Sequence, residues 1–304
     1  MLEIKNVSVS FGAVRAIDDV SFTVAEKTTT VVVGESGSGK SVMLSAIMHI
    51  LPDTANVAGS ILLNGEELLD KTEKQMQKIR GNALSYIPQG SGTSMNPLLK
   101  VGLQVAEPLM EKKKEKKSSA LQKAVEWMKA LNLGNETALA ASYPHTLSGG
   151  MRQRALIAMG AISGAPLLLA DEPTKGLDGE RVETVTEIFN ELQDRTVLCV
   201  SHDLNFTRAI ADNVVVMYAS QMVESCSNEE FFEQPLHPYS QMILLAMPEN
   251  GLQINMGFAP PQTDRNKGGC LFYSRCPYAS DRCLKTPPLI ETGSRKVRCW
   301  KYAD

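Results

Sequence analysis

The stretch Gly34-Glu35-Ser36-Gly37-Ser38-Gly39-Lys40-Ser41 fits the phosphate-loop pattern G-x-x-x-x-G-K-[ST]. It follows a β-branched run at 28–33, which predicts a buried strand. It precedes residues 42–50, where apolar side chains recur at helical spacing. Glycines between a strand and a helix N-terminus let backbone N–H groups turn toward an anion, and the helix dipole adds partial positive charge. The stretch therefore predicts a site for the phosphates of a nucleoside triphosphate.

The polar side chains of this loop have distinct expected roles. Lys40 is expected to reach the β- and γ-phosphates, and the Ser41 hydroxyl is expected to ligate Mg²⁺. The other loop residues expected to contact the nucleotide are Gly34, Ser36, Gly37, Ser38 and Gly39.

The composition is that of an ordinary globular protein. The chain has 304 residues, of which 43% are hydrophobic and 21% charged, and its net charge is −3. This balance gives no electrostatic reason to expect nucleic acid as a partner. Apolar runs of eighteen or more residues are absent from the sequence, and its start, MLEIKNVSVSF, lacks the layout of a signal peptide. We therefore expect a cytoplasmic chain without a transmembrane segment.

Strand and helix patterns alternate after the phosphate loop. Short apolar strands are predicted at 83–87, 166–171, 196–200 and 214–218, and helices at 151–162, 180–192 and 204–211. A helical stretch at 98–141 is inserted among them, with an apolar stripe of Leu121, Val125, Met128, Leu131 and Leu133. The pattern predicts an α/β fold with a largely parallel sheet.

Two adjacent carboxylates end one of these strands. Asp171 and Glu172 follow the apolar run at 166–170. A carboxylate at the end of a strand beside a phosphate loop can hold Mg²⁺, and a second can orient the attacking water or accept its proton. We expect Asp171 in the first role and Glu172 in the second.

A second anion site is predicted far along the chain. Ser148, Gly149 and Gly150 open the helix at 151–162, and such a helix start presents N–H groups and a hydroxyl to an anion. One nucleotide does not need two phosphate-binding helix starts. This suggests a site shared between two chains.

The run Leu147-Ser148-Gly149-Gly150-Met151-Arg152-Gln153-Arg154 resembles the signature of ATP-binding cassette (ABC) ATPases. The resemblance implies a RecA-like P-loop NTPase core with an N-terminal antiparallel β subdomain, an inserted α-helical subdomain and a small Cys-rich C-terminal extension. It also implies that each signature caps the γ-phosphate of ATP held by a second cassette. The implied domains are the cassette core at 1–92 and 155–245, the helical subdomain at 93–154 and the extension at 246–304.

Further positions match the family's motifs. The resemblance implies that Gln89 contacts Mg²⁺, that Asp178 lies near the dimer interface, and that His202 supports the γ-phosphate and Glu172. Phe11 is expected to stack on adenine. Lys175 stands where the family usually has a small or hydroxylic residue, and we expect it not to touch the chemistry.

Segments outside the cassette motifs resemble the oligopeptide, dipeptide and nickel importer ATPases, notably PLHPYS at 235–240. This implies the ATP-hydrolysing subunit of a binding-protein-dependent importer, bound to the cytoplasmic face of the membrane. Its implied partners are two separate permeases, a second ABC ATPase in a heterodimer rather than a homodimer, and indirectly a solute-binding protein. The implied solute is a peptide, or alternatively nickel or a metal chelate. A soluble redox-sensing or regulatory ATPase is the alternative.

Four cysteines near the end of the chain, Cys270, Cys276, Cys283 and Cys299, have the spacing C-x5-C-x6-C-x15-C. In a reducing compartment this favours a metal centre over disulfides. Zinc sites usually contain C-x2-C pairs, whereas a cubane iron–sulfur cluster needs four cysteines and tolerates wider spacing. The resemblance to the importer ATPases also implies a [4Fe–4S] cluster here. Zinc, free thiols and disulfides are the alternatives.

Overall fold

The computed structural model describes residues 1–90, 94–192, 194–251, 257–265 and 267–303. The chain divides into two compact units, each described here separately. Unit 1 comprises Met1–Ala25, Thr30–Lys71 and Ala211–Asp304, and unit 2 comprises Glu26–Thr29 and Thr72–Ile210.

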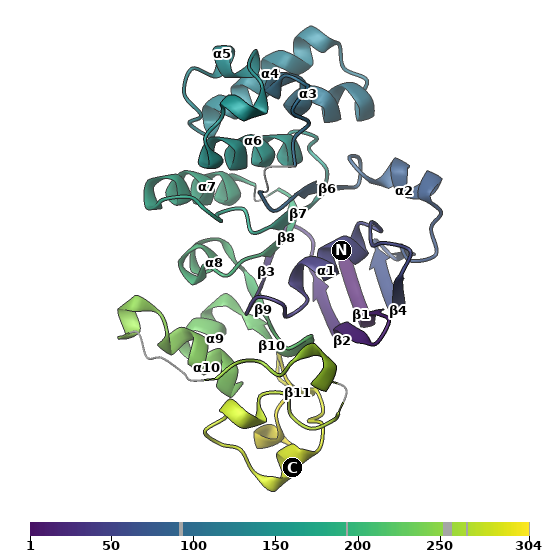
Figure 1. Ribbon diagram of the computed structural model, residues 1–304, viewed down its shortest axis with the longest axis vertical. Helices are drawn as coiled ribbons and strands as arrows, with labels where there is room; N and C mark the ends of the chain where they lie inside the picture. The colour runs from purple at the N-terminus through teal and green to yellow at the C-terminus, as the bar shows by residue number, and fades with distance from the viewer. Residues whose placement is uncertain (91–93, 193, 252–256, 266, 304) are drawn as a thin grey trace. The chain divides into compact units, whose positions relative to one another are not determined.

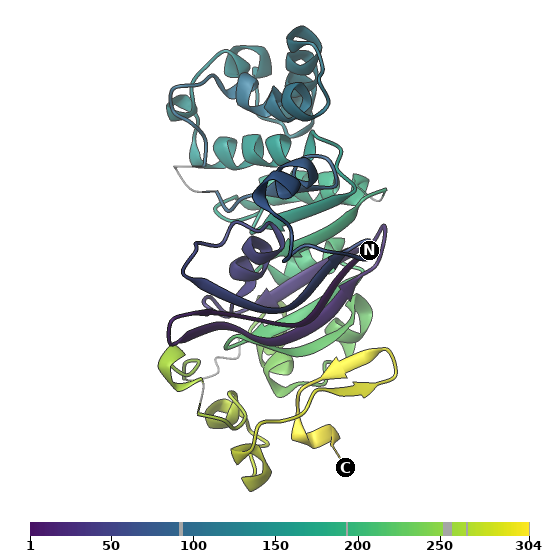
Figure 2. The same ribbon diagram turned by 90° about the vertical axis from the view of Figure 1, so that its right-hand side faces the viewer.

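Unit 1 begins with an antiparallel sheet of long strands, drawn in purple and blue in Figures 1 and 2. The strands of this sheet lie in the order β2-β1-β4-β5. Their bounds are β1 (Leu2–Phe11), β2 (Val14–Val24), β4 (Ala55–Leu63) and β5 (Glu66–Glu67). Leu2, Ile4, Val7 and Val9 on β1 are buried, because alternate side chains of a strand face the core. The sheet agrees with the predicted N-terminal β subdomain.

The second group of strands in unit 1 carries the phosphate loop. Strand β3 (Thr29–Gly34) pairs in parallel with β9 (Asn213–Tyr218), which pairs antiparallel with β10 (Gln221–Ser227). The short hairpin of β11 (Ile290–Thr292) and β12 (Arg295–Val297) continues this group along β10 (Figure 2). The helices of unit 1 are α1 (Lys40–Ile47), α9 (Asn228–Glu233) and α10 (Pro238–Leu245).

Unit 2 contains three parallel neighbouring strands, β6 (Leu84–Ile87), β7 (Leu167–Asp171) and β8 (Thr196–Val200). Every residue of β7 and β8 is buried, as expected of parallel strands covered on both faces. The helices outside the segment 101–161 are α2 (Glu73–Ile79), α7 (Gly179–Glu191) and α8 (Leu204–Ile210).

The remaining helices of unit 2 form the group in the upper part of Figure 1. They are α3 (Val101–Lys112), α4 (Lys117–Ala130), α5 (Glu136–Ala140) and α6 (Gly149–Ala161). The buried face of α4 consists of Ala120, Ala124 and Met128, whereas Leu121 and Val125 are only partly buried. Most of the predicted stripe is therefore buried, since Leu131 and Leu133 just after this helix are buried as well, and alanines take the place of Leu121 and Val125 on the packed face.

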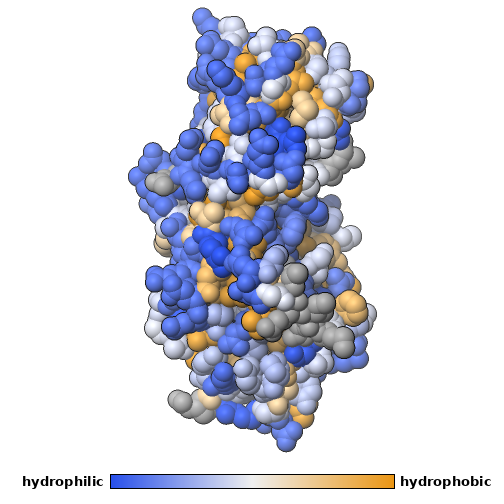
Figure 3. Space-filling view, turned by 90° about the vertical axis from the view of Figure 1, so that its left-hand side faces the viewer, coloured by the Kyte–Doolittle hydropathy of each residue, from blue (hydrophilic) through white to orange (hydrophobic). Residues whose placement is uncertain are grey.

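The predicted domain boundaries remain predictions. The boundary between 92 and 93 lies outside the described residues, and the one between 154 and 155 falls inside α6. Among the described residues, helices with the length and apolarity needed to cross a bilayer are absent. Hydrophilic residues cover most of the face shown in Figure 3, and apolar residues show between them.

Candidate functional site

The phosphate loop of unit 1 connects the end of β3 to the start of α1, as predicted. The Nζ of Lys40 donates hydrogen bonds to the carbonyl oxygens of Gly34 at 2.7 Å and Glu35 at 2.9 Å. The buried ammonium group therefore lies within the concave side of the loop. A cation in this position suits the phosphates of a nucleotide.

Two glycines of the loop cannot be replaced without strain. Gly34 has φ 150°, and a Cβ there would lie 2.0 Å from the carbonyl oxygen of Met217 on β9. Gly39 has φ 101°, and its Cβ would lie 2.4 Å from the carbonyl oxygen of Ala16 on β2. Both glycines are therefore required by the close packing of strands around the loop.

Phe11, predicted to stack on adenine, is the last residue of β1 and is partly buried. It pairs in register with Val14 on β2 and Ala55 on β4. It thus belongs to the same unit as the phosphate loop, and its contact with adenine stays a prediction.

In unit 2 the buried Asp171 ends β7, and its Oδ2 accepts a hydrogen bond from the hydroxyl of Tyr86 on β6 at 3.4 Å. Burial raises the pKa of Tyr86, and the nearby Asp171 raises it further, so the phenol stays a proton donor. Tyr86 was not predicted from the sequence. The available signal was its position one residue before the end of β6, beside β7 in a parallel sheet.

The next residue, Glu172, lies beside His202, the histidine expected to support it. The Nδ1 of His202, which follows β8, lies 2.7 Å from Glu172 Oε2. The imidazole is more than half exposed, while the glutamate side chain is largely buried. The arrangement leaves the histidine accessible to a ligand and places its ring beside the carboxylate.

Lys175 also lies near this carboxylate, with its Nζ 3.8 Å from Glu172 Oε2. The expectation that Lys175 takes no part in the chemistry stays a prediction. The turn after β7 explains the contact, since the N–H of Lys175 bonds the carbonyl of Glu172 and returns the chain toward it.

Gln153 is a further residue that the sequence analysis did not identify. The side chain is buried, and its Nε2 donates to the carbonyl oxygens of Pro173 at 3.1 Å and Glu172 at 3.5 Å. A Cβ on Gly90 would lie 1.5 Å from the Oε1 of Gln153, so this side chain would have to move to admit a larger residue there. Gln153 therefore lies between the turn carrying Glu172 and the segment of Gln89, which is partly buried just after β6.

The second predicted anion site forms the start of α6. Ser148 caps this helix and accepts a hydrogen bond from the N–H of Met151 at 3.3 Å. Ser148 and Gly149 are exposed, and a Cβ on Gly150 would lie 3.4 Å from Leu177. The helix start is therefore open to a ligand and packs beside the segment that contains Asp178.

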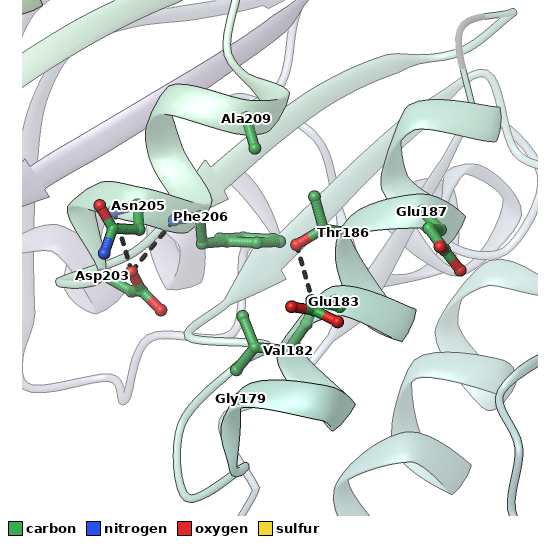
Figure 4. Close-up of a pocket in the computed structure, with 9 residues that line it drawn as sticks. All are labelled: Gly179, Val182, Glu183, Thr186, Glu187, Asp203, Asn205, Phe206 and Ala209. Atoms are coloured by element: carbon green, nitrogen blue, oxygen red, sulfur yellow. Dashed lines mark hydrogen bonds between the residues drawn. The ribbon is translucent and has the colours of Figure 1, made fainter.

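Asp178 caps α7, where its Oδ1 accepts a hydrogen bond from the N–H of Arg181 at 3.2 Å and its side chain pairs with the Arg181 guanidinium. A surface cavity of about 550 Å³ lies farther along α7. Figure 4 shows it between α7 and α8, with Phe206 pointing toward Thr186. This cavity does not include Asp171, Glu172 or His202 among its lining residues.

Known proteins match the chain over its full length. The family described as ABC transporter matches residues 17–175. The oligopeptide transport ATP-binding protein AppD of Bacillus subtilis is 37% identical over 319 residues, covering 100% of this chain and 97% of that protein. The oligopeptide transport ATP-binding protein OppD of Escherichia coli is also 37% identical, covering 100% and 94%.

The chain belongs to the ABC transporter family. A second family, described as the C-terminal region of oligopeptide/dipeptide transporters, matches residues 223–283 of this ABC protein. A solved dimeric structure of the bacterial ABC transporter cassette MJ0796 has a TM-score of 0.69 and 26% identity, covering 75% of this chain and 99% of that one. The predicted ABC ATPase cassette and its resemblance to oligopeptide and dipeptide importer ATPases are therefore confirmed.

The metal centre predicted at the four cysteines of this ABC protein's C-terminal extension is not supported by the described structure. Among the described residues, groups of three or more His, Cys, Asp or Glu side chains placed to hold a metal ion are absent. Burial raises the pKa of Cys270 to about 11, and it also raises the pKa of Cys276 and Cys299. Cysteines ligate metals as thiolates, so each of these thiols would have to release its proton on binding a metal.

Proposed function

We propose that this chain is the ATP-hydrolysing subunit of an importer for oligopeptides or dipeptides. The observation that carries the hydrolytic role is the contact of His202 Nδ1 with Glu172 Oε2 at 2.7 Å. Glu172 directly follows Asp171, the last residue of β7. A carboxylate held by an accessible imidazole can position water and accept its proton. The peptide solute is supported by the names of the relatives and by the match at 223–283.

The proposed reaction divides the work among the predicted residues. Lys40 and the loop amides bind the triphosphate, and Phe11 stacks on the adenine. Ser41, Asp171 and Gln89 would hold Mg²⁺, which would neutralise phosphate charge when bound. Glu172 orients the water and accepts its proton as the water oxygen bonds to the γ-phosphorus and the bond to ADP breaks. His202 holds Glu172 and contacts the γ-phosphate.

We further propose that two cassettes close on ATP, with Ser148, Gly149 and Gly150 of each capping the γ-phosphate bound by the other. The exposed start of α6 supports this arrangement, and the relative MJ0796 is described as a dimer. Asp178 would lie at the contact between cassettes. The second cassette is proposed to be a different ABC ATPase, and both would serve two permeases at the cytoplasmic face of the membrane.

The test of the hydrolytic role is Glu172→Gln in the complex assembled with its permeases. We expect retained ATP binding, a closed pair of cassettes and a loss of turnover of about a hundredfold or more, because the water loses its proton acceptor. Calorimetry with ATP, light scattering and phosphate release measure the three effects.

The matched control is Glu187→Gln, which removes the charge of an exposed glutamate on α7. This variant is expected to hydrolyse ATP normally. Near-normal turnover by Glu172→Gln would contradict the proposed role. Light scattering of the purified chain with ATP, alone and with a second ATPase, separates a homodimer from a heterodimer.

The solute is tested by uptake into proteoliposomes carrying the permeases and the solute-binding protein. ATP-dependent uptake of a labelled tetrapeptide or dipeptide is expected. Uptake of Ni²⁺ without peptide uptake would favour the nickel alternative, which the relatives' names do not support.

The [4Fe–4S] cluster stays a sequence-based prediction, which the described residues do not support. No step of the proposed reaction depends on it. Iron content and visible absorption of anaerobically purified protein test the prediction. An iron-free, colourless sample would remove the cluster, and with it the support for the redox-sensing alternative, without affecting the importer.

A further inference from the structure

The C-terminal extension reaches the phosphate loop within unit 1. The Nη1 of Arg275 donates to Glu35 Oε1 at 2.8 Å. The Nη1 of Arg265 donates to the carbonyl oxygen of Gly37 at 3.0 Å and to the Ser220 hydroxyl at 2.7 Å. Two arginines from a segment more than two hundred residues away thus hold the loop expected to bind ATP.

Arg275 is fixed in place by its surroundings. Its side chain is only 6% exposed, and the guanidinium lies over the rings of Tyr218 at 5.7 Å and Phe272 at 5.6 Å. Nη1 also donates to the Tyr218 hydroxyl at 3.4 Å, and Nη2 lies 3.6 Å from the sulfur of Met242. A guanidinium held in this way offers its partner a fixed hydrogen-bond donor, because the side chain has already lost its rotational freedom.

Glu35 is restrained on its backbone as well as its side chain. Its N–H donates to the hydroxyl of the buried Tyr239 at 2.9 Å, and its carbonyl oxygen accepts from Lys40 Nζ at 2.9 Å. The same residue therefore links Arg275 and Tyr239 to the lysine of the phosphate loop. A loop already held in shape loses less freedom when it binds phosphate.

We propose that Arg275 and Glu35 form a clamp through which the C-terminal extension positions the phosphate loop and sets the affinity for ATP. Arg275 acts through Glu35 and is a positioning residue. The proposal rests on the proposed role of residues Gly34 to Ser41 in binding ATP.

The experiment measures Mg-ATP binding by calorimetry on the full chain. Arg275→Ala and Glu35→Gln are each expected to weaken ATP binding about tenfold, as for loss of one partly exposed charge-assisted hydrogen bond. The double variant is expected to bind no more weakly than either single one, because both remove the same contact. Arg275→Lys is expected to recover part of the affinity.

The matched control is Arg282→Ala in the same extension, where the guanidinium stacks on Trp300 at 5.1 Å. It is expected to leave the ATP affinity unchanged. Additive losses in the double variant, or unchanged affinity in Glu35→Gln with a normal melting temperature, would overturn the clamp. If Arg275→Ala disturbs folding, Glu35→Gln still tests the clamp, because Glu35 is the more exposed partner.

Lys40→Ala separates this proposal from the one on which it rests. Lost ATP binding in Lys40→Ala together with unchanged binding in the clamp variants would reject the clamp alone. Normal ATP binding in Lys40→Ala would reject the assigned phosphate loop itself.

Discussion

Glu172 has an unusual backbone for a residue with a side chain. Its φ is 50°, in the left-handed region, and its N–H is bonded to the carbonyl of Val200 at 2.9 Å. Such a conformation costs of the order of 1 kcal/mol and persists where neighbouring groups hold it. Gln153 supplies part of that support through the carbonyls of Glu172 and Pro173.

Replacing Gln153 by Ala is expected to lower kcat for ATP hydrolysis about tenfold, because two carbonyls lose a buried donor and the turn carrying Glu172 relaxes. The Kd for ATP should change little, since the phosphate loop is in the other unit. Phosphate release and calorimetry measure the two constants. Gln122→Ala on the exposed face of α4 is the control. A loss of ATP affinity with normal kcat would contradict this role.

The ends of neighbouring elements carry most of the candidate site. Asp171 ends β7, His202 follows β8, and Ser148 and Asp178 cap α6 and α7. Because side chains at strand ends and helix starts are anchored by the element behind them, the packing of α7 and α8 should support the site. Phe206 on α8 meets Phe189 on α7 edge to face, with 5.5 Å between ring centroids.

Phe206→Ala is therefore expected to destabilise the protein by about 3–4 kcal/mol, since the ring is almost fully buried. Phe206→Leu should recover about half of this loss because it refills most of the volume. Thermal or urea unfolding measures both. A change below about 1 kcal/mol in Phe206→Ala would show that α7 and α8 collapse around the lost ring.

At the scale of the whole molecule, one buried histidine links stability to pH. His237 caps α10, its Nδ1 accepts from the N–H of Tyr239 at 3.0 Å, and its ring lies near Phe272. Burial lowers the pKa of His237 to about 3, although a hydrogen bond to the backbone of Arg298 opposes the shift. The folded protein thus keeps this imidazole neutral where the unfolded chain protonates it.

Below about pH 6.5 the His237 imidazole is protonated in the unfolded state, whereas in the folded state it stays neutral down to about pH 3. As the pH is lowered through this window, the unfolding free energy should therefore fall by up to about 1.4 kcal/mol per pH unit. Above about pH 6.5 this group should cause no change in the unfolding free energy. Urea unfolding between pH 7 and 4 measures the slope. His237→Asn keeps a helix cap and should flatten it; an unchanged slope would assign the pH dependence to other groups.

The candidate site could be predicted where its chemistry requires consecutive residues. The phosphate loop, the start of α6 and the Asp171-Glu172 pair each occupy one short stretch, because a helix terminus or strand end places neighbouring residues on one ligand. The same locality made β3, β7 and β8 recognisable from their buried apolar runs. It also led to the confirmed ABC family.

Contacts between distant segments could be found only in the folded chain. Arg275 and Glu35 are 240 residues apart, and Gln153 meets the turn after β7 from another helix. The thiols of the extension show the converse, because their spacing in the sequence predicted a cluster that the described structure does not support. A short stretch of sequence specifies which groups face a ligand at one helix start or strand end. The packing of the whole chain decides which distant side chains hold those groups in position.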